Sequence, residues 1–170
     1  MIAWRIEYAR HLEEALSGEG ARRYGGRWNE KGVPVVYLSS QLGLAALEKF
    51  VHAVPAGEGI ALHAVAVEIA SRYVEGAHRP ARLPDDWRDA EPGMGTMSWG
   101  SQWARSRQSL VALVPSALLP LTCFEHSWEF NLMLNPEHED MGEIRVLERP
   151  RYSFDPRMWK GKESSASRAP

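Results

Sequence analysis

The sequence predicts one α+β domain in which a mixed β-sheet is flanked by helices. The chain has 170 residues, 44% of them hydrophobic and 25% charged, so it can bury a core of ordinary size. Segments with the two-residue period of strands and segments with helical spacing follow one another in irregular order, which is typical of α+β proteins. No apolar run approaches the roughly 20 residues that span a bilayer.

The first part of the chain is predicted to contain three strands and two helical segments. The strands show alternation or β-branched runs, and the helical segments end at glycine or proline. In order, the segments are the strand Ala3–Tyr8 with Trp4 and Ile6 on one side, the short helix Arg10–Leu16, the loop Ala21–Pro34, the strand Val35–Leu38, the helix Gln41–Ala53 and the strand Ala61–Ile69.

The second part begins with a polar connection rich in proline, aspartate and glycine, Tyr73–Gly100, which we interpret as a pocket wall or a lid. The segments after it are the helix Ser98–Gln108, the strand Leu110–Val114, an alternating strand Trp128–Leu134 and a strand Ile144–Leu147. Residues 160–170 lack apolar anchors and are expected to be disordered. The predicted domain therefore spans residues 1–159.

The helix near residue 48 carries a carboxylate in an unusual place. If Ser39 or Ser40 caps its N-terminus, then Leu44, Leu47 and Val51 form one apolar stripe. Glu48 falls at the edge of that stripe and points toward the protein body. Because an unpaired buried charge is very costly, Glu48 needs a partner. The nearest candidates in the sequence are Arg22, Arg23 and Arg27.

Composition excludes several functional classes. A net charge of −2 gives no electrostatic reason to expect direct nucleic-acid binding. The single cysteine, Cys123, cannot form an internal disulfide, which fits a reducing compartment. The charged N-terminus has no apolar segment of a signal peptide. We therefore expect a cytoplasmic protein without membrane attachment.

Most sequence motifs of catalytic or cofactor sites are absent. The six histidines include no HExxH pair, and Cys123 with His126 is too weak a signal, so no metal is predicted. The patterns of dinucleotide-binding loops, P-loops and nucleophile elbows do not occur. The segment RRYGGR, residues 22–27, remains open: it is either a glycine turn with solvated arginines or a turn that aims Arg27 at an anionic ligand.

The stretch from Gly20 to His52, GARRYGGRWNEKGVPVVYLSSQLGLAALEKFVH, resembles the signature of the RES domain, the toxin of RES–Xre toxin–antitoxin pairs. Three further segments match that family in order, so that the resemblance covers residues 3–157: VPSALLP at Val114–Pro120, Asn131–His138, and FDPR at Phe154–Arg157.

The resemblance implies a set of site residues. Arg27 matches the family arginine, Glu48 the glutamate, Ser116 the serine, and Tyr37 an accompanying tyrosine. These four are the implied catalytic residues. Residues implied to contact the substrate are Arg27, Tyr37, Arg22, Arg23, Ser39 and Asn135.

The resemblance also implies a fold similar to ADP-ribosyltransferases and a toxin that degrades NAD⁺. The reaction would be hydrolysis or phosphorolysis of the nicotinamide–ribose bond, with NAD⁺ as substrate and no metal. Glu48 would stabilise the oxocarbenium-like cation, as carboxylates do in glycoside cleavage. Arg27 would bind the pyrophosphate. The implied partners are an Xre-type helix-turn-helix antitoxin and a second copy of the toxin.

Other interpretations of the same residues stay open. Glu48 could form a structural ion pair with Arg27, Tyr37 could be a core residue, Ser39 a helix cap, and Ser116 a turn residue. The alternative functions are an ADP-ribosyltransferase that modifies a protein and a binding module without catalysis.

Overall fold

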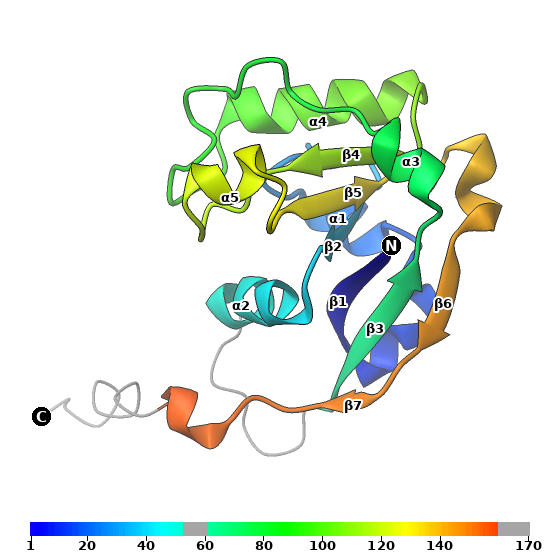
Figure 1. Ribbon diagram of the computed structural model, residues 1–170, viewed down its shortest axis with the longest axis vertical. Coiled ribbons are helices and arrows are strands. Elements are labelled where there is room, and N and C mark those ends of the chain that lie inside the picture. The colour runs from blue at the N-terminus through cyan, green and yellow to red at the C-terminus, as the bar shows by residue number, and fades with distance from the viewer. Residues whose placement is uncertain (53–60, 160–170) are drawn as a thin grey trace, which may run out of the picture.

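The structure is a computed structural model that describes residues 1–52 and 61–159 (Figure 1). Seven strands form one sheet in the order β4-β5-β2-β1-β3-β6, with β7 also paired to β3, and every neighbouring pair is antiparallel. The strands are β1 Ile2–Tyr8, β2 Val36–Ser39, β3 Leu62–Glu68, β4 Val111–Val114, β5 Asn131–Leu134, β6 Arg145–Glu148 and β7 Arg151–Tyr152.

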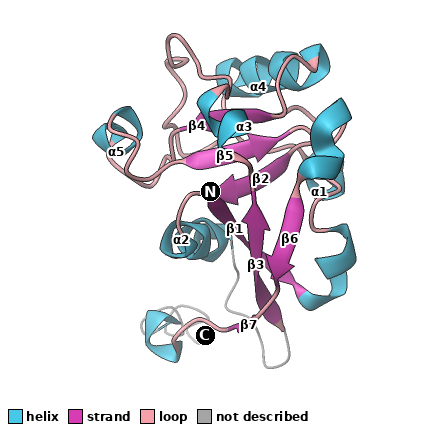
Figure 2. Cartoon of the chain, turned by 45° about the vertical axis from the view of Figure 1, so that its right-hand side comes forward, coloured by secondary structure: helices cyan, strands magenta, loops and turns pink. Residues whose placement is uncertain are grey.

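Helices flank both faces of this sheet (Figure 2). The α-helices are α1 Glu19–Tyr24, α2 Leu42–His52, α3 Ser71–Glu75, α4 Met94–Ser106 and α5 Leu121–Glu125. The 3₁₀ helices are η1 Ala9–Glu14, η2 Glu139–Glu143 and η3 Pro156–Trp159. Within the described ranges, no helix is long and apolar enough to cross a membrane.

The sheet consists of two halves that meet at a narrow junction. Between β1 and β2 only Trp4 and Ser39 are in register, whereas β1 pairs with β3 along its whole length and β2 with β5 along all four residues. Figure 1 accordingly shows β4 and β5 lying at a steep angle to β1 and β3. The one register pair lies at Ser39, the last residue of β2, and α2 follows directly after it in the chain.

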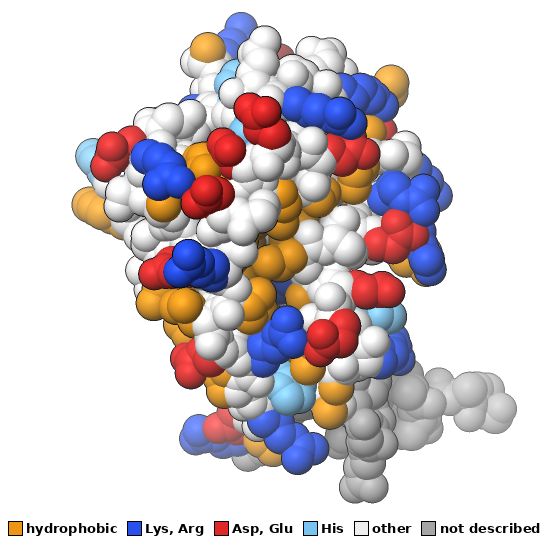
Figure 3. All heavy atoms as spheres, turned by 90° about the vertical axis from the view of Figure 1, so that its right-hand side faces the viewer, with side chains coloured by type: hydrophobic (Ala, Val, Ile, Leu, Met, Phe, Trp, Pro, Cys, Tyr) orange, Lys and Arg blue, Asp and Glu red, His pale blue; other side chains and the backbone are white. Residues whose placement is uncertain are grey.

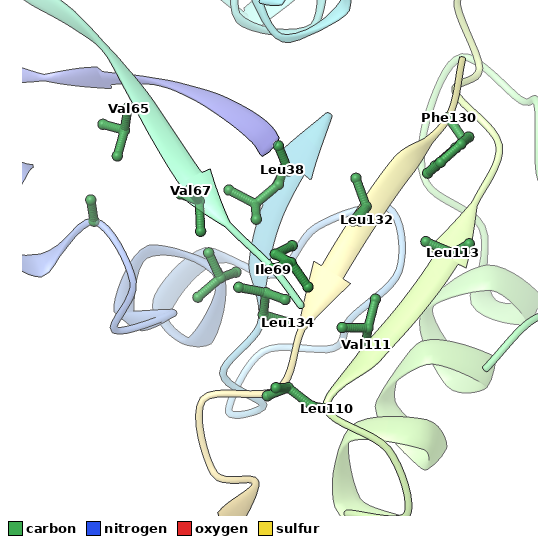
Figure 4. Close-up of a cluster of buried hydrophobic side chains, with 13 residues drawn as sticks. Leu38, Val65, Val67, Ile69, Leu110, Val111, Leu113, Phe130, Leu132 and Leu134 are labelled. Carbon is green, nitrogen blue, oxygen red and sulfur yellow. The ribbon is translucent and has the colours of Figure 1, made fainter. Parts of the chain in front are cut away.

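One apolar core joins the two halves on one face of the sheet. Its side chains come from both halves and are almost completely buried (Figure 4). Aliphatic residues that alternate along the strands supply it, because every second side chain of a strand points to the same face. The residues labelled in the figure are Leu38, Val65, Val67, Ile69, Leu110, Val111, Leu113, Phe130, Leu132 and Leu134.

The opposite face is covered by two different helices. Helix α4 packs its Trp103 and Ala104 against the β4-β5-β2 half, where they belong to one cluster with Met133 of β5. Helix α2 packs Ala45 against Ile6 on the β1-β3 half. At the other end of β2 and β5, Ser39 and Asn131 project toward this face and lie beside α2.

The predicted α+β fold with one mixed domain is confirmed in its main elements. The strands expected from residues 3, 35, 61, 110 and 144 onward all form, and so do the two long helices. The sequence patterns did not indicate α1, α3, α5 or β7, which are all short. The end of the first predicted long helix and residues 160–170 lie outside the described residues.

The strand predicted from Trp128 to Leu134 is too long at its N-terminal end. Strand β5 begins only at Asn131, and the Trp128 side chain is 66% exposed. The main-chain N–H groups of Trp128 and Glu129 donate to the Cys123 carbonyl and so belong to the turn that ends α5. Ser127 enters this turn in a left-handed conformation, with φ of 56°.

The apolar stripe predicted for α2 is wrong. Leu44 is buried as expected, but Leu47 and Val51 are 43% and 57% exposed. The face that packs on the sheet instead carries Leu44 and Ala45, with the half-buried Glu48 and Lys49 one turn further on. Two charged residues on a packed face require polar partners in the sheet below them.

The surface on the β6 side shows no accumulation of one charge sign. On this face, Lys and Arg side chains are interspersed with Asp and Glu, and apolar atoms are visible between them (Figure 3). This distribution agrees with the small net charge of −2. It is unlike the basic stripe by which a protein binds nucleic acid.

Candidate active site

Three segments that are distant in the sequence meet at the Glu48 carboxylate. Its Oε1 atom accepts a hydrogen bond of 2.8 Å from the Ser116 hydroxyl and one of 2.6 Å from the Asn131 side-chain amide. Glu48 comes from α2, Ser116 follows β4, and Asn131 begins β5. In Figure 1 the end of β4, the start of β5 and α2 lie on the same side of the molecule.

Further hydrogen bonds orient the two donors. The Asn131 Oδ1 atom accepts a 2.8 Å bond from the Ser39 hydroxyl, which turns the Nδ2 group of Asn131 toward Glu48. The Ser116 oxygen accepts from the Leu118 main-chain N–H at 3.1 Å, so its own proton is directed at the carboxylate. Ser39 is thus a positioning residue here and not a helix cap. We call Glu48, Ser116, Asn131 and Ser39 the carboxylate cluster.

Tyr37 projects to the same face of the sheet as Ser39, because the two are separated by two residues on β2. Its hydroxyl donates to Asn29 Oδ1 at 2.7 Å and accepts from the Trp28 main-chain N–H at 3.0 Å. Burial raises the pKa of the Tyr37 hydroxyl well above its ordinary value, and the nearby Arg27 charge offsets only part of this rise. The hydroxyl therefore stays neutral and keeps its proton for Asn29.

The loop before β2 is held in place by Asn29, which is completely buried. Its side-chain amide donates to the carbonyls of Ala21, Glu30 and Val33. Gly26 is required in this loop, since a Cβ atom there would lie 2.8 Å from the Tyr37 hydroxyl. These contacts fix the backbone on both sides of Arg27.

The Arg27 guanidinium lies against the connection between α3 and α4. It donates to the carbonyl of Trp87 at 3.2 Å and to that of Ala90 at 3.4 Å. Within the described residues it forms no ion pair with a carboxylate. Its charge is therefore available to an anion.

The structure brings together five of the residues named from the sequence and separates three others from them. Ser39, Glu48 and Ser116 meet in the carboxylate cluster, and Tyr37, on the same face of β2 as Ser39, bonds the loop that carries Arg27. Arg22 and Arg23 pair instead with Glu19 on α1, and these bonds lower the pKa of the Glu19 carboxyl to about 2. Asn135 is 1% exposed and donates to the Ala104 carbonyl, which ties β5 to α4.

Glu48 has the hydrogen-bonding partners that its position requires, but they are Ser116 and Asn131 and none of the three candidate arginines. In the part of the chain that the structure describes, both bonds to its carboxylate come from uncharged donors, and no cation lies within ion-pair distance. An ion pair with Arg27, the structural alternative, is absent from the described residues for the same reason. The carboxylate keeps its negative charge for a ligand.

The sequence did not assign Asn131 a role at Glu48. Asn131 lies opposite Ser39 in the β2–β5 register, and only strand pairing reveals that the two side chains meet. Nothing in the sequence indicated that Asn29 accepts the hydrogen bond of the Tyr37 hydroxyl. One surface hollow of the structure is lined by Lys31–Pro34 with Arg105, and another by Pro80–Asp85 with α5. Neither of these two hollows includes Glu48 or Arg27.

Comparison with known proteins gives this arrangement a family. Residues 2–155 match the RES domain. The chain belongs to the RES domain family. Three relatives named as toxins have similar sequences over most of their lengths, so this RES protein is assigned to the same group of toxins.

The relatives come from different bacteria. A protein of Sphingobium sp. strain YBL2 named "Prs ADP-ribosylating toxin" is 40% identical over 160 residues, covering 91% of this chain and 94% of that protein. "Toxin Res" of Yersinia enterocolitica is 35% identical over 93% of this chain and 99% of its own length. "Toxin Res" of Photorhabdus laumondii is 32% identical over 96% of this chain and 100% of its own length.

A solved structure shares the fold. The crystal structure of the M. tuberculosis MbcT–MbcA toxin–antitoxin complex contains a chain that matches with a TM-score of 0.61 at 18% sequence identity. The match covers 89% of this RES chain and 84% of the other chain. At this identity the likeness concerns the fold, and it confirms the predicted α+β domain in which helices flank one sheet; the sheet itself is antiparallel throughout.

Proposed function

We propose that this RES toxin cleaves the nicotinamide–ribose bond of NAD⁺ by hydrolysis or phosphorolysis. The observation that carries the proposal is the Glu48 carboxylate, which is fixed by two uncharged donors and carries no counter-ion in the described structure. A fixed negative charge over the interior strands β5 and β2, with a neutral tyrosine on the same face of β2 and an arginine on the loop before that strand, suits a substrate that develops positive charge at one end and carries phosphates at the other.

Glu48 acts in this proposal by electrostatic stabilisation. When the C–N bond breaks, nicotinamide leaves with the bonding electron pair and becomes neutral, while positive charge develops on the ribose carbon and ring oxygen. The fixed carboxylate stabilises that charge more than it stabilises the ground state, which lowers the barrier. Ser116 and Asn131 hold Glu48 in place, so little reorganisation is needed during the reaction.

The second substrate then completes the bond change. In hydrolysis, a water oxygen bonds to the ribose carbon and its proton passes to solvent, which gives ADP-ribose. In phosphorolysis, a phosphate oxygen bonds to the same carbon. No covalent intermediate with the protein and no metal is needed, because the leaving group already carries the positive charge that nicotinamide loses.

Arg27 binds the pyrophosphate in this proposal. A guanidinium forms stronger hydrogen bonds to phosphate than to neutral carbonyls, because both partners are then charged. The two carbonyls that Arg27 now contacts would be exchanged for phosphate oxygens. Tyr37 holds the loop that carries Arg27, because its hydroxyl bonds the Trp28 N–H and the Asn29 side chain.

The test measures nicotinamide release from NAD⁺ by purified wild type and by Glu48→Gln, with and without phosphate. Glutamine retains an oxygen that accepts from Ser116 and Asn131, so the variant removes charge with little change in packing. We expect release to fall by about 100-fold or more. Glu143→Gln, an exposed carboxylate paired with Arg72, is the matched control and should behave as wild type. Equal release by wild type and Glu48→Gln would refute the proposal.

Protein ADP-ribosylation is a second candidate function. The name of the Sphingobium relative, an ADP-ribosylating toxin at 40% identity, favours it. Both reactions use the same NAD⁺ half of the site and differ in the nucleophile that receives the ribose carbon. NAD⁺ labelled in its adenylate part distinguishes them: label retained on a cellular protein supports transfer, and label recovered only as free ADP-ribose supports degradation.

A binding module without catalysis is tested by growth. Induction of the chain alone in bacteria should arrest growth, and Glu48→Gln or Arg27→Gln should restore it if the toxin acts as an enzyme. Arrest that persists in both variants would instead indicate a binding function.

We further propose that a protein antitoxin of the Xre helix-turn-helix type silences this toxin, and that the toxin dimerises within the complex. Exposed apolar side chains near the carboxylate cluster support a partner surface there, since such patches commonly mark protein interfaces. Each lies one to three residues in sequence from Glu48, Ser116 or Asn131: Leu47, Val51, Leu118 and Trp128. Co-expression with a neighbouring helix-turn-helix gene, followed by light scattering, checks both the partner and the stoichiometry.

A further inference from the structure

The arginines of this chain differ in what they contact. Most arginines with a polar side-chain contact pair with a carboxylate, namely Arg5, Arg22, Arg23, Arg72, Arg82, Arg105, Arg107, Arg149 and Arg157. Arg27 and Arg88 instead donate only to main-chain carbonyls within the described structure. Arg88 donates from Nε to the Ala117 carbonyl at 3.3 Å.

These two arginines meet at one short segment of the α3–α4 connection. The Arg27 guanidinium contacts the Trp87 carbonyl, and that carbonyl forms the peptide bond to Arg88. The Arg88 side chain reaches in the other direction to Ala117, the residue after Ser116. Since Ser116 bonds Glu48, Arg88 connects the arginine side of the candidate active site to its carboxylate side.

The segment that carries Arg88 is anchored immediately before it. The Asp86 carboxylate accepts from the main-chain N–H groups of Gly95 and Thr96 at 2.7 and 3.2 Å, at the start of α4. Gly93 lets the backbone pass so close that an added Cβ atom would meet the Asp86 carboxylate at 2.0 Å. Asp86 thus anchors the chain directly before Trp87 and Arg88, and the position of the Arg88 backbone is set before a ligand binds.

We propose that Arg88 is a second phosphate-binding residue of the candidate active site, and that Arg27 and Arg88 together bind the diphosphate of the substrate. The inference rests on the proposed function, because it names a further contact of the same dinucleotide. Its physical basis is the exchange of neutral acceptors for charged ones. Each guanidinium now bonds to uncharged carbonyls, so a phosphate displaces no carboxylate: Arg27 exchanges its carbonyls for phosphate oxygens, and Arg88 binds phosphate with its terminal nitrogens.

The bonding of Arg88 also explains why an arginine suits the proposed contact with phosphate. The guanidinium presents several N–H donors in one plane, so it can keep the Nε bond to Ala117 while its terminal nitrogens bind phosphate. This geometry places a diphosphate between Arg27 and the Ser116 turn. The ribose that follows the diphosphate then lies toward Glu48.

The experiment measures binding separately from turnover. Isothermal titration with ADP-ribose and with inorganic pyrophosphate measures the affinity of each variant. The parent is Glu48→Gln, which we expect not to degrade NAD⁺ and therefore not to be toxic during expression. Arg88→Gln, Arg88→Lys or Arg82→Gln is added to it as a second substitution. Arg82 lies on the same connection and pairs with Asp85, so its substitution is the matched control. The same arginine substitutions in the wild-type background give KM and kcat for NAD⁺.

We expect Arg88→Gln to weaken both ligands by about 10-fold or more, as the loss of one charge-assisted contact implies. KM for NAD⁺ should rise by a similar factor with little change in kcat. Arg88→Lys should recover part of the affinity because it keeps the charge, and Arg82→Gln should match the parent. A merely structural role of Arg88 would lower the melting temperature without this rescue by lysine.

The outcomes separate this inference from the proposed function. Pyrophosphate binding that is unchanged in Arg88→Gln overturns the role of Arg88, whatever happens to NAD⁺. Pyrophosphate binding that depends on Arg88 in a protein that releases no nicotinamide supports the role of Arg88 and refutes NAD⁺ cleavage.

Discussion

At the scale of single residues, the chemistry depends on which groups leave Glu48 charged. A carboxylate that bonds an arginine has little negative charge to offer a ligand, whereas one held by a hydroxyl and an amide keeps it. Ser116 and Asn131 supply this uncharged support from the turn after β4 and from the start of β5. In the proposed mechanism, the toxin therefore needs Arg27 and Glu48 to be present and also needs them not to bond each other.

Tyr37→Phe tests the support of the Arg27 loop. The substitution removes the donor to Asn29 Oδ1 and the acceptor of the Trp28 N–H, and both partners are buried. We expect the free energy of unfolding to fall by about 1–3 kcal/mol because buried polar groups lose their partners. Urea unfolding measures it. Tyr24→Phe, at a side chain that is 76% exposed, is the control, and an equal effect of the two substitutions would contradict the assignment.

The residues that the sequence could reveal are those whose spacing is local. Arg27, Tyr37 and Glu48 follow one another through a loop, a strand and a helix, so a family resemblance locates all three. Asn131 is different, because its role depends on the β2–β5 register and on the amide orientation set by Ser39. Arg22 and Arg23 looked equivalent to Arg27 in the sequence, but they lie on a helix that ends at Tyr24, and Glu19 on the same helix binds both.

At the scale of elements, α2 shows why hydrophobic periodicity misplaced a face. The sequence offers the stripe Leu44, Leu47 and Val51, but α2 packs through Leu44 and Ala45 and keeps Glu48 and Lys49 against the sheet. Glu48 finds Asn131 below it, and Lys49 lies 4.0 Å from the Glu7 carboxylate and 3.8 Å from the centre of the Tyr8 ring. Polar groups in the sheet thus determine the rotation of the helix, and periodicity cannot show them.

Glu7→Gln tests how α2 is held on β1. Burial raises the pKa of the Glu7 carboxyl, but Arg5, the Tyr8 N–H and Lys49 together outweigh it and lower the pKa overall. A lowered pKa means that the carboxylate stabilises the fold above its unfolded pKa of about 4.3 and loses this effect as the pH falls through the folded value. Glu7→Gln should therefore lower the free energy of unfolding at neutral pH by about 2 kcal/mol.

The pH series supplies the decisive comparison for Glu7. Wild type should lose stability on acidification below its unfolded pKa, and the difference between wild type and Glu7→Gln should shrink over that range. Urea unfolding at several pH values measures it. Glu13→Gln, whose side chain is 89% exposed and pairs with Arg149, should change stability little at any pH. A difference that stays constant with pH would show that Glu7 acts through packing alone.

Gly100→Ala tests the contact between α4 and the Arg27 loop. A Cβ atom at residue 100 would lie 1.9 Å from the Trp28 carbonyl oxygen, so α4 must move away from the backbone next to Arg27. We expect a loss of about 1–3 kcal/mol in the free energy of unfolding, as overpacking of a buried contact causes, together with slower nicotinamide release. Thermal unfolding and the release assay measure the two effects.

Gly43→Ala is the matched control, because it makes the same substitution within α2 where nothing lies within 4 Å. Alanine has the higher helix propensity, so this variant should be neutral or more stable by about 0.5–1 kcal/mol. If both glycine variants behaved alike, helix propensity and not the contact with Trp28 would explain the result.

At the scale of the whole molecule, the carboxylate cluster lies at the narrow junction between the two halves of the sheet, because its Ser39 also forms the register pair between β1 and β2. The halves share only one register pair between β1 and β2, yet the core on the opposite face contains side chains from both, including Val65 and Leu132. The two halves are thus joined by little strand pairing between β1 and β2 but by one continuous apolar core. The common core on one face supports the strands whose polar side chains meet at the junction on the other face.

This combination predicts that the two halves unfold together. Leu132→Ala in the β2-β5 half should cost about 2–5 kcal/mol and Val65→Ala in the β1-β3 half somewhat less, because each deletes methyl groups from a fully buried position. Each variant should shift the whole urea transition, since a loss in either half weakens the common core. Tryptophan fluorescence, to which Trp28 and Trp103 in one half and Trp4 in the other contribute, and far-UV circular dichroism should give coincident curves with a single transition. Two separate transitions, only one of them shifted by Val65→Ala, would instead mean that hydrogen bonding at the β1–β2 junction sets cooperativity. The carboxylate cluster would then span two independently stable units, and Glu48 could lose Asn131 without global unfolding.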